Sequence, residues 1–116
     1  MADLKKQANG EMLQGTLDML VLRTLVMGRA HGHTIARVIE NTSEDVLQVE
    51  QGSLYPALHR LEDRGWVRSS WGVSENNRKA KFYELTAAGR KQLAAERERW
   101  QQMVVAIGRV LGAAAE

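Results

Sequence analysis

Small, hydroxylic, aromatic and cationic side chains recur between residues 52 and 60, and such groups can contact the phosphates and base edges of a nucleic acid. In the same stretch Leu54, Leu58 and Leu61 stand at i, i+4 and i+7, the spacing of one helix face. With that apolar face turned inward, the polar groups fall on the opposite side. We expect there Gly52, Ser53, Pro56, His59 and Arg60, with Tyr55 on the flank.

This pattern also fits an ordinary amphipathic helix with a solvated outer face, so the neighbouring elements decide between the two interpretations. Two strand-like runs follow at residues 66–71 and 79–85, joined by a polar, turn-rich segment. Helices followed by a hairpin with a basic tip are typical of a winged helix-turn-helix. In that fold the third helix enters the major groove and the hairpin lies along the neighbouring backbone. The hairpin residues expected to meet DNA are Asn76, Asn77, Arg78, Lys79 and Lys81.

The preceding elements are predicted from apolar periodicity and from end signals. A strongly apolar helix is expected over residues 16–27, capped by Thr16 and followed by a glycine. Because Pro56 cannot donate a backbone hydrogen bond, the third helix should begin near Gly52 with Ser53 as its cap, or at Glu50. The weaker predictions are a short helix over 3–11, a second helix over 33–41 and a short strand over 46–49.

A long final helix is expected from Thr86, its cap, to Leu111, roughly 40 Å at ~1.5 Å per residue. Leu93, Trp100 and Ile107 repeat every seven residues, as in a coiled-coil-like seam. This length exceeds what the small domain needs for its own core. We therefore expect its far half, and the apolar first helix, to pack on a second copy; contact with a different protein stays open as an alternative.

The motifs together resemble the PadR family of bacterial transcriptional regulators, over nearly the whole chain. The resemblance rests on GSLYPALHRLEDRGW at 52–66 and KFYELTAAGR at 81–90, with weaker support from residues 15–22 and 31–36. It departs at His33, where relatives often carry Tyr. The resemblance implies a homodimeric winged-helix repressor that binds a palindromic operator in double-stranded DNA and is released by a small molecule or another signal.

The resemblance also concerns Trp100. In some family members a Trp on the final helix lies at the dimer interface and flanks a pocket for flat aromatic compounds. Trp100 stands fourteen residues after Thr86, which resembles that placement; an interface anchor without a ligand is the other interpretation. A small aromatic effector is thus a candidate ligand. The residues assigned to this interface or effector site are Trp100, Met103, Val104 and Ile107.

The charge distribution agrees with nucleic-acid binding. Residues 1–59 hold five Lys and Arg against seven Asp and Glu, whereas residues 60–99 hold ten against six. Local charge of this sign attracts phosphate. The chain has no cysteine, as is common in a reducing cytoplasm. It has neither an apolar run near the ~20 residues of a membrane span nor a secretory apolar segment, so we expect a cytoplasmic protein without membrane contact.

Catalytic and metal sites are not predicted. His31 and His33 flank Gly32, and His59 is remote from them, so no recognisable metal-ligand spacing is completed. We expect no enzyme, no metal and no cofactor.

The sequence therefore predicts a mainly α fold with a small β-hairpin. A winged helix-turn-helix DNA-binding domain with an N-terminal helix occupies residues 1–85, and a C-terminal dimerisation helix occupies 86–116 and forms one structural unit with it. Two other functions stay open: a winged-helix module that binds a polypeptide, and a general nucleic-acid binder without an operator.

Overall fold

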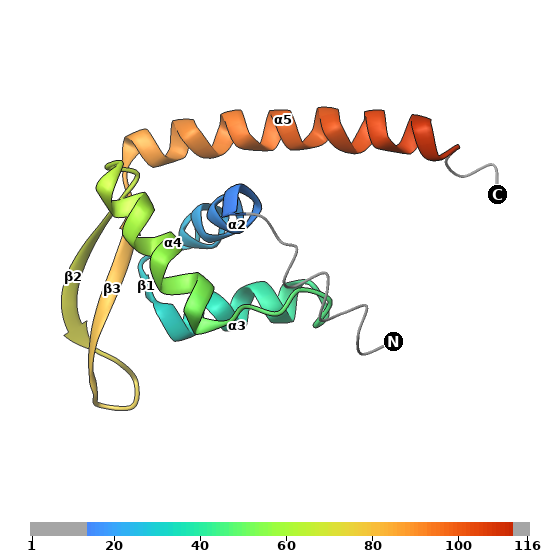
Figure 1. Ribbon diagram of the computed structural model, residues 1–116. Coiled ribbons are helices and arrows are strands. Elements are labelled where there is room, and N and C mark those ends of the chain that lie inside the picture. Colours follow the sequence, from blue (N-terminus) through green and yellow to red (C-terminus); the bar gives the residue numbers. More distant parts are fainter. Residues whose placement is uncertain (1–13, 113–116) are drawn as a thin grey trace.

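The computed structural model describes residues 14–112, so the helix expected over 3–11 lies outside the described residues. Figure 1 shows the helices of residues 14–63 packed together, the long C-terminal helix across one side, and a hairpin whose tip lies on the opposite side. In chain order the elements are α2 (Gln14–Leu25), β1 (Ala30–His31), α3 (Gly32–Thr42), α4 (Gln51–Asp63), β2 (Val67–Val73), β3 (Lys79–Leu85) and α5 (Ala87–Leu111).

The core lies where α2, α3 and α4 meet the base of the hairpin. Leu54, Leu58 and Leu61 are all buried, which confirms that the apolar face of α4 turns inward. Buried side chains of α2 and α3 pack against this face, because removing the apolar surface of each helix from water is favourable. The fully buried side chains that form the centre of this core are Val21, Leu22, Leu25, Ile35, Leu54, Leu58, Leu61 and Val67.

The sheet has the strand order β1-β3-β2 and is antiparallel throughout. Its short first strand pairs Ala30 with Tyr83, and local sequence pattern does not predict this pairing. The strand expected over 46–49 was wrong, because its backbone amides bond to side chains of the α3 region instead. Leu47 N donates to Ser43 Oγ at 3.1 Å, and Val49 N donates to a carboxylate oxygen of Glu40 at 2.9 Å.

Two predicted helix starts need correction. α2 already includes Gln14, so Thr16 lies inside the helix and is not its cap. α4 begins at Gln51 with Glu50 as the flanking residue, so the earlier of the two predicted starts is close to the observed one and Ser53 lies within the first turn. Pro56 therefore falls in the second turn, on the exposed side of the helix.

The start of α5 is hydrogen-bonded to the turn between α4 and β2. Thr86 caps the helix as predicted, because its hydroxyl oxygen accepts from Gly89 N at 3.0 Å. The same hydroxyl donates to Gly65 O at 2.7 Å, and Thr86 N donates to Trp66 O at 3.1 Å. Gly89 lies so close to this turn that an added Cβ would stand 2.1 Å from Trp66 O.

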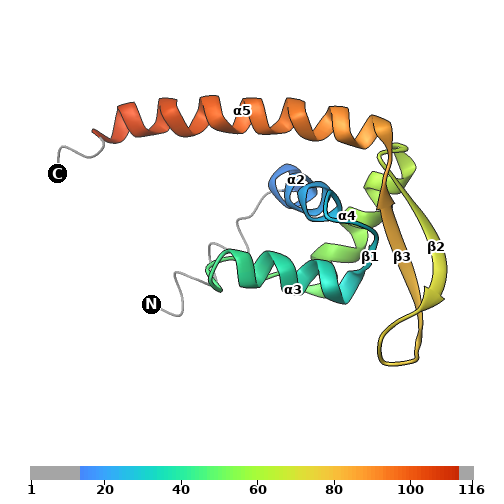
Figure 2. The same cartoon turned by 180° about the vertical axis from the view of Figure 1, so that it is seen from behind.

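The far half of α5 leaves the rest of the described domain. The helix has 25 residues, which corresponds to about 38 Å. Leu93 is its last buried residue, and Figures 1 and 2 both show the later turns extending past α2 and α3. The exposed apolar residues on these turns are Trp100, Met103, Val104, Val105, Ile107, Val110 and Leu111.

Candidate nucleic-acid interface

The outer face of α4 carries the polar residues expected there, with one exception. Ser53 and His59 are exposed, and Tyr55 is 46% exposed. The Tyr55 ring rests on Gly32 at the start of α3, where an added Cβ would stand 2.7 Å from the phenolic oxygen. Glycine at position 32 thus leaves room for the ring. His59 Nε2 lies 3.5 Å from Asp63 Oδ2, and both side chains are largely exposed.

The exception is Arg60, which does not join the outer face. Its Nη2 donates to Asp18 Oδ1 on α2 at 2.8 Å, and both side chains are mostly covered. In the free chain Arg60 therefore holds α4 to α2, and its predicted contact with DNA, which would have to compete with the Asp18 carboxylate, stays a prediction. The carboxylate is 42 positions earlier in the chain, so helical spacing alone could not reveal the pair.

The hairpin is held to α4 through Glu62. One carboxylate oxygen of Glu62 accepts from Ser69 Oγ on β2 at 2.6 Å. The other lies 3.8 Å from Lys81 Nζ on β3. Glu62 thus bridges both strands, and the hairpin has a defined position beside the helix. Lys81 remains partly exposed and its ammonium lies 6.0 Å from the ring centre of Tyr83.

A hollow opens between the start of α3, the outer side of α4 and the hairpin. It brings together Tyr55 of α4 and both lysines predicted on β3, Lys79 and Lys81. The hydrogen bond from Ser69 to Glu62 helps to hold the hairpin and α4 at their observed separation. The lining of the hollow is mainly aromatic and cationic. It consists of His31, Gly32, His33, Tyr55, Trp71, Lys79, Ala80, Lys81 and Tyr83.

Burial and nearby groups raise the pKa of Tyr83, which lines the hollow. The cause is first its burial, then the charge of Glu62 and the proximity of Tyr55. The phenol therefore stays protonated and neutral over the physiological pH range. The cationic character of the hollow thus comes from its lysines.

The tip of the hairpin is a tight turn that exposes the predicted polar groups. Ser74 N donates to Arg78 O at 2.8 Å, and Asn77 N donates to Ser74 O at 2.9 Å. Asn77 has φ of 60°, a left-handed conformation that Asn tolerates better than most residues. Asn76, Asn77 and Arg78 are exposed, so their side chains are accessible to a partner.

A histidine links this tip to the start of α3. His31 Nε2 lies 3.4 Å from Glu75 Oε1 and 3.3 Å from Thr34 Oγ1. The pKa of the Glu75 carboxyl is lowered, first by a hydrogen bond from its own backbone amide and then by His31. The His31 and Phe82 rings also form a T-shaped pair, with ring centres 5.4 Å apart. These contacts orient the hairpin relative to the helices.

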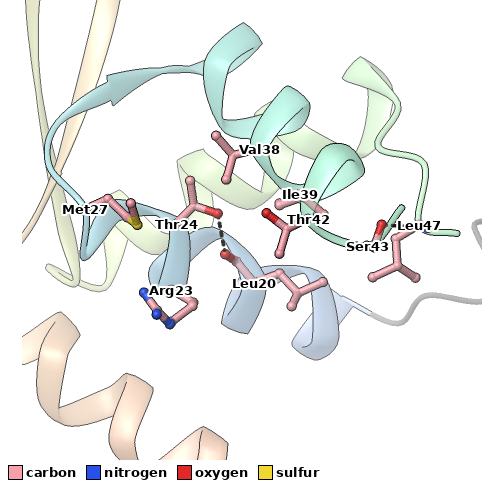
Figure 3. Close-up of a pocket in the computed structure, with 9 residues that line it drawn as sticks. All are labelled: Leu20, Arg23, Thr24, Met27, Val38, Ile39, Thr42, Ser43 and Leu47. Atoms are coloured by element: carbon pink, nitrogen blue, oxygen red, sulfur yellow. Dashed lines mark hydrogen bonds between the residues drawn. The ribbon is translucent and has the colours of Figure 1, made fainter. Parts of the chain in front are cut away.

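A second, mainly apolar pocket lies between α2, α3 and the loop that follows α3 (Figure 3). Its most buried polar residue is Thr24, whose hydroxyl donates to Leu20 O at 3.0 Å. That hydroxyl is therefore already satisfied within α2. The pocket offers no cluster of catalytic groups, and its lining residues are Leu20, Arg23, Thr24, Met27, Val38, Ile39, Thr42, Ser43 and Leu47.

Three residues of the interface region were not assigned a role in DNA contact from the sequence. Trp71, His31 and Glu75 come together only through the hairpin and the β1–β3 pairing. Alternation along β2 is the one signal that could have placed Trp71 on the same face as Val67.

Among residues 14–112 no group of three or more His, Cys, Asp or Glu side chains is arranged to hold a metal ion. Within the same range no helix combines the length and apolarity that a bilayer crossing requires.

The architecture and this surface define a winged-helix protein. Residues 21–95 match the model of the transcriptional regulator PadR-like family. The chain belongs to this family of transcriptional regulators, as the sequence motifs had indicated.

Solved structures agree with the family assignment. A PadR family transcriptional regulator from Eggerthella lenta is 27% identical, with a TM-score of 0.76 over 95% of this chain and 94% of that one. A transcriptional regulator from Clostridium thermocellum is 26% identical, with a TM-score of 0.75 over 82% of this chain and 89% of that one. An uncharacterized protein from Lysinibacillus sphaericus is 25% identical over 93 residues, which are 80% of this chain and 85% of its own.

Proposed function

We propose that this regulator acts as a homodimer that binds double-stranded DNA at a palindromic operator. The observation that carries the proposal is the shared hollow, onto which Tyr55 of α4 and Lys79 and Lys81 of the hairpin all open. A helix beside a cationic hairpin matches the groove and flanking backbone of a duplex.

The proposed contacts divide by element. Ser53, Tyr55 and His59 meet DNA from the exposed side of α4. From the hairpin, Arg78, Lys79 and Lys81 bind backbone phosphates, with Asn76 and Asn77 at the tip. Arg60 would join them only by leaving Asp18, which holds it against α2 in the free chain. The hairpin tip and the start of α4 lie on the side away from α5 (Figures 1 and 2), so a duplex can approach them without meeting that helix.

The second copy is proposed to cover α5. Beyond Leu93 the stripe of Trp100, Val104 and Ile107 is 45–49% exposed in the single chain. Burying such apolar surface is favourable at roughly 25 cal/mol per Å². A twofold pair joined through these stripes would also present two α4 helices, which is what a palindromic site requires.

Repression, and release by a small aromatic molecule or another signal, complete the proposal. Their support is the family to which the chain belongs. Trp100 is the proposed contact for an aromatic effector because it is the large aromatic side chain on the exposed stripe. Binding there would change how two copies pair and hence the separation of their α4 helices.

The experiment that tests the proposal is recovery and sequencing of the chromosomal fragments that the purified protein retains from its own genome. We expect a small set of fragments that share an inverted repeat with half-sites about one helical turn, ~34 Å, apart. Equal retention of all fragments at physiological salt would indicate a general nucleic-acid binder. Failure to retain any fragment, even at low salt, would contradict DNA binding and favour a module that binds a polypeptide.

A further inference from the structure

The outer end of the hairpin exposes two large apolar side chains among its cations. Trp71 is 63% exposed and Val73 is 65% exposed. Because side chains alternate between the two faces of a strand, both lie on the same face of β2 as Val67, which is buried in the core. The same sheet face therefore packs on the domain at its inner end and is open at its outer end.

The charged side chains that the hairpin itself places on this face are lysines, while Glu62 of α4 lies against Ser69 and Lys81. The antiparallel register pairs Trp71 with Lys81 and Val73 with Lys79. Lys79 Nζ lies 5.2 Å from the centre of the Trp71 ring, close enough for a cation–π interaction. Trp71 and Tyr55 also line the same hollow, so the indole lies on the side of the hairpin next to α4.

The two acidic residues of the hairpin lie elsewhere. Glu84 belongs to the opposite sheet face, where Arg68 Nε lies 3.3 Å from its carboxylate. Glu75 is in the tip beside His31. A partner that docks on the face of Trp71 thus meets an aromatic ring flanked by ammonium groups, with no carboxylate of the hairpin on that face.

We infer that Trp71 contacts the DNA backbone directly: its indole packs on a deoxyribose while Lys79 and Lys81 bind the flanking phosphates. The inference rests on the proposed DNA binding and adds an apolar contact to it. A nucleic-acid backbone alternates apolar sugar with anionic phosphate, which is the alternation that this face complements. Removing a ring of this kind should weaken duplex binding about tenfold, which corresponds to about 1.4 kcal/mol.

The test uses the fluorescence of Trp71 in the full chain. The chain has three tryptophans, so Trp66→Phe with Trp100→Phe leaves Trp71 as the only one. Acrylamide quenching is measured with and without a random duplex of about 30 base pairs at about 50 mM salt, where non-specific binding is strong. We expect the duplex to reduce the quenching constant at least about twofold, because bound sugar excludes the quencher. In the matched protein that retains only Trp100, the constant should stay unchanged.

The second measurement is the affinity of the protein for the same duplex. Trp71→Ala should weaken binding about tenfold without altering the dependence on salt, since no charge is removed. Trp71→Phe should recover most of the loss because a ring remains. Intact duplex binding with unchanged Trp71 quenching, or Trp71→Ala binding like the parent protein, would overturn this inference alone. Absence of duplex binding by the parent protein would overturn the proposed function as well.

Discussion

The guanidinium of Arg60 on α4 donates two hydrogen bonds to the carboxylate of Asp18 on α2, with Nη2 to Oδ1 at 2.8 Å and Nε to Oδ2 at 3.4 Å. The Arg60 side chain is 27% exposed and that of Asp18 is 15% exposed. A charge-assisted pair in this partly covered setting is stronger than a surface ion pair. It joins the proposed recognition helix to the most apolar helix of the domain.

Asp18→Asn should therefore lower the free energy of unfolding by about 2 kcal/mol, because Arg60 would lose its ionic partner. Urea denaturation measures the change. Asp63→Asn is the control, since Asp63 is exposed and lies 3.5 Å from an exposed His59, and it should change stability by less than about 0.5 kcal/mol. Equal stability of Asp18→Asn and the parent protein would mean that Arg60 is free to act elsewhere.

Gly89→Ala should destabilise the domain by at least about 3 kcal/mol, because the new methyl group would overlap the carbonyl oxygen of Trp66. A backbone atom cannot move aside as a side chain can. The control is Gly52→Ala in α4, where an added Cβ meets nothing within 4 Å. Gly52→Ala should leave the free energy of unfolding unchanged or raise it by up to about 1 kcal/mol. Thermal unfolding of both variants tests the difference, and a stable Gly89→Ala protein would contradict the observed junction.

Lys79→Ala and Lys81→Ala should each weaken binding to every duplex sequence. Loss of one phosphate contact reduces the slope of log affinity against log salt by about 0.9. Fluorescence anisotropy of labelled duplex at several salt concentrations measures that slope. Lys91→Ala provides the control, because Lys91 is exposed on α5, away from the hairpin tip, and its removal should leave the slope unchanged. A changed sequence preference with an unchanged slope would show that the lysines contact bases instead.

Val104→Glu should convert the proposed dimer to monomers and weaken operator binding at least about tenfold, because a charge would enter an apolar interface. Val105→Glu is a closely matched control. The two valines are neighbours with nearly equal exposure, 49% and 51%, but one helical step separates Val105 from the stripe of Trp100 and Ile107. Analytical ultracentrifugation gives the oligomeric state. Dissociation by both substitutions, or by neither, would contradict the proposed stripe.

Glu75→Gln should alter stability only at pH values where Glu75 is ionised. Its pKa in the folded protein lies below the ordinary value of 4.5, so the ionised carboxylate stabilises the folded state above pH 4.5. That contribution is lost as the pH falls through the lowered pKa. The melting temperatures of the parent protein and Glu75→Gln should therefore differ near pH 6, and the difference should shrink as the pH falls below 4.5 and the carboxylate is protonated. A difference that does not shrink as the pH falls would contradict a role for this carboxylate at the tip.

Local pattern was sufficient to predict much of this protein. The inward face of α4, the Thr86 cap and the hairpin follow from spacing and turn chemistry within a few residues, because helices and hairpins are closed by nearby hydrogen bonds. The motif at residues 52–66 also indicated the family, which the match over residues 21–95 confirms.

Tertiary structure decided what those side chains contact. Arg60 meets Asp18, 42 positions away, and His31 meets Glu75, 44 positions away. The pairing of β1 with β3 likewise joins distant segments, whereas the amides of Leu47 and Val49 bond to side chains around the end of α3, and residues 46–49 form no strand. Periodicity specifies which face of an element is apolar or polar. Only the packed arrangement specifies which distant residue satisfies each polar group on that face.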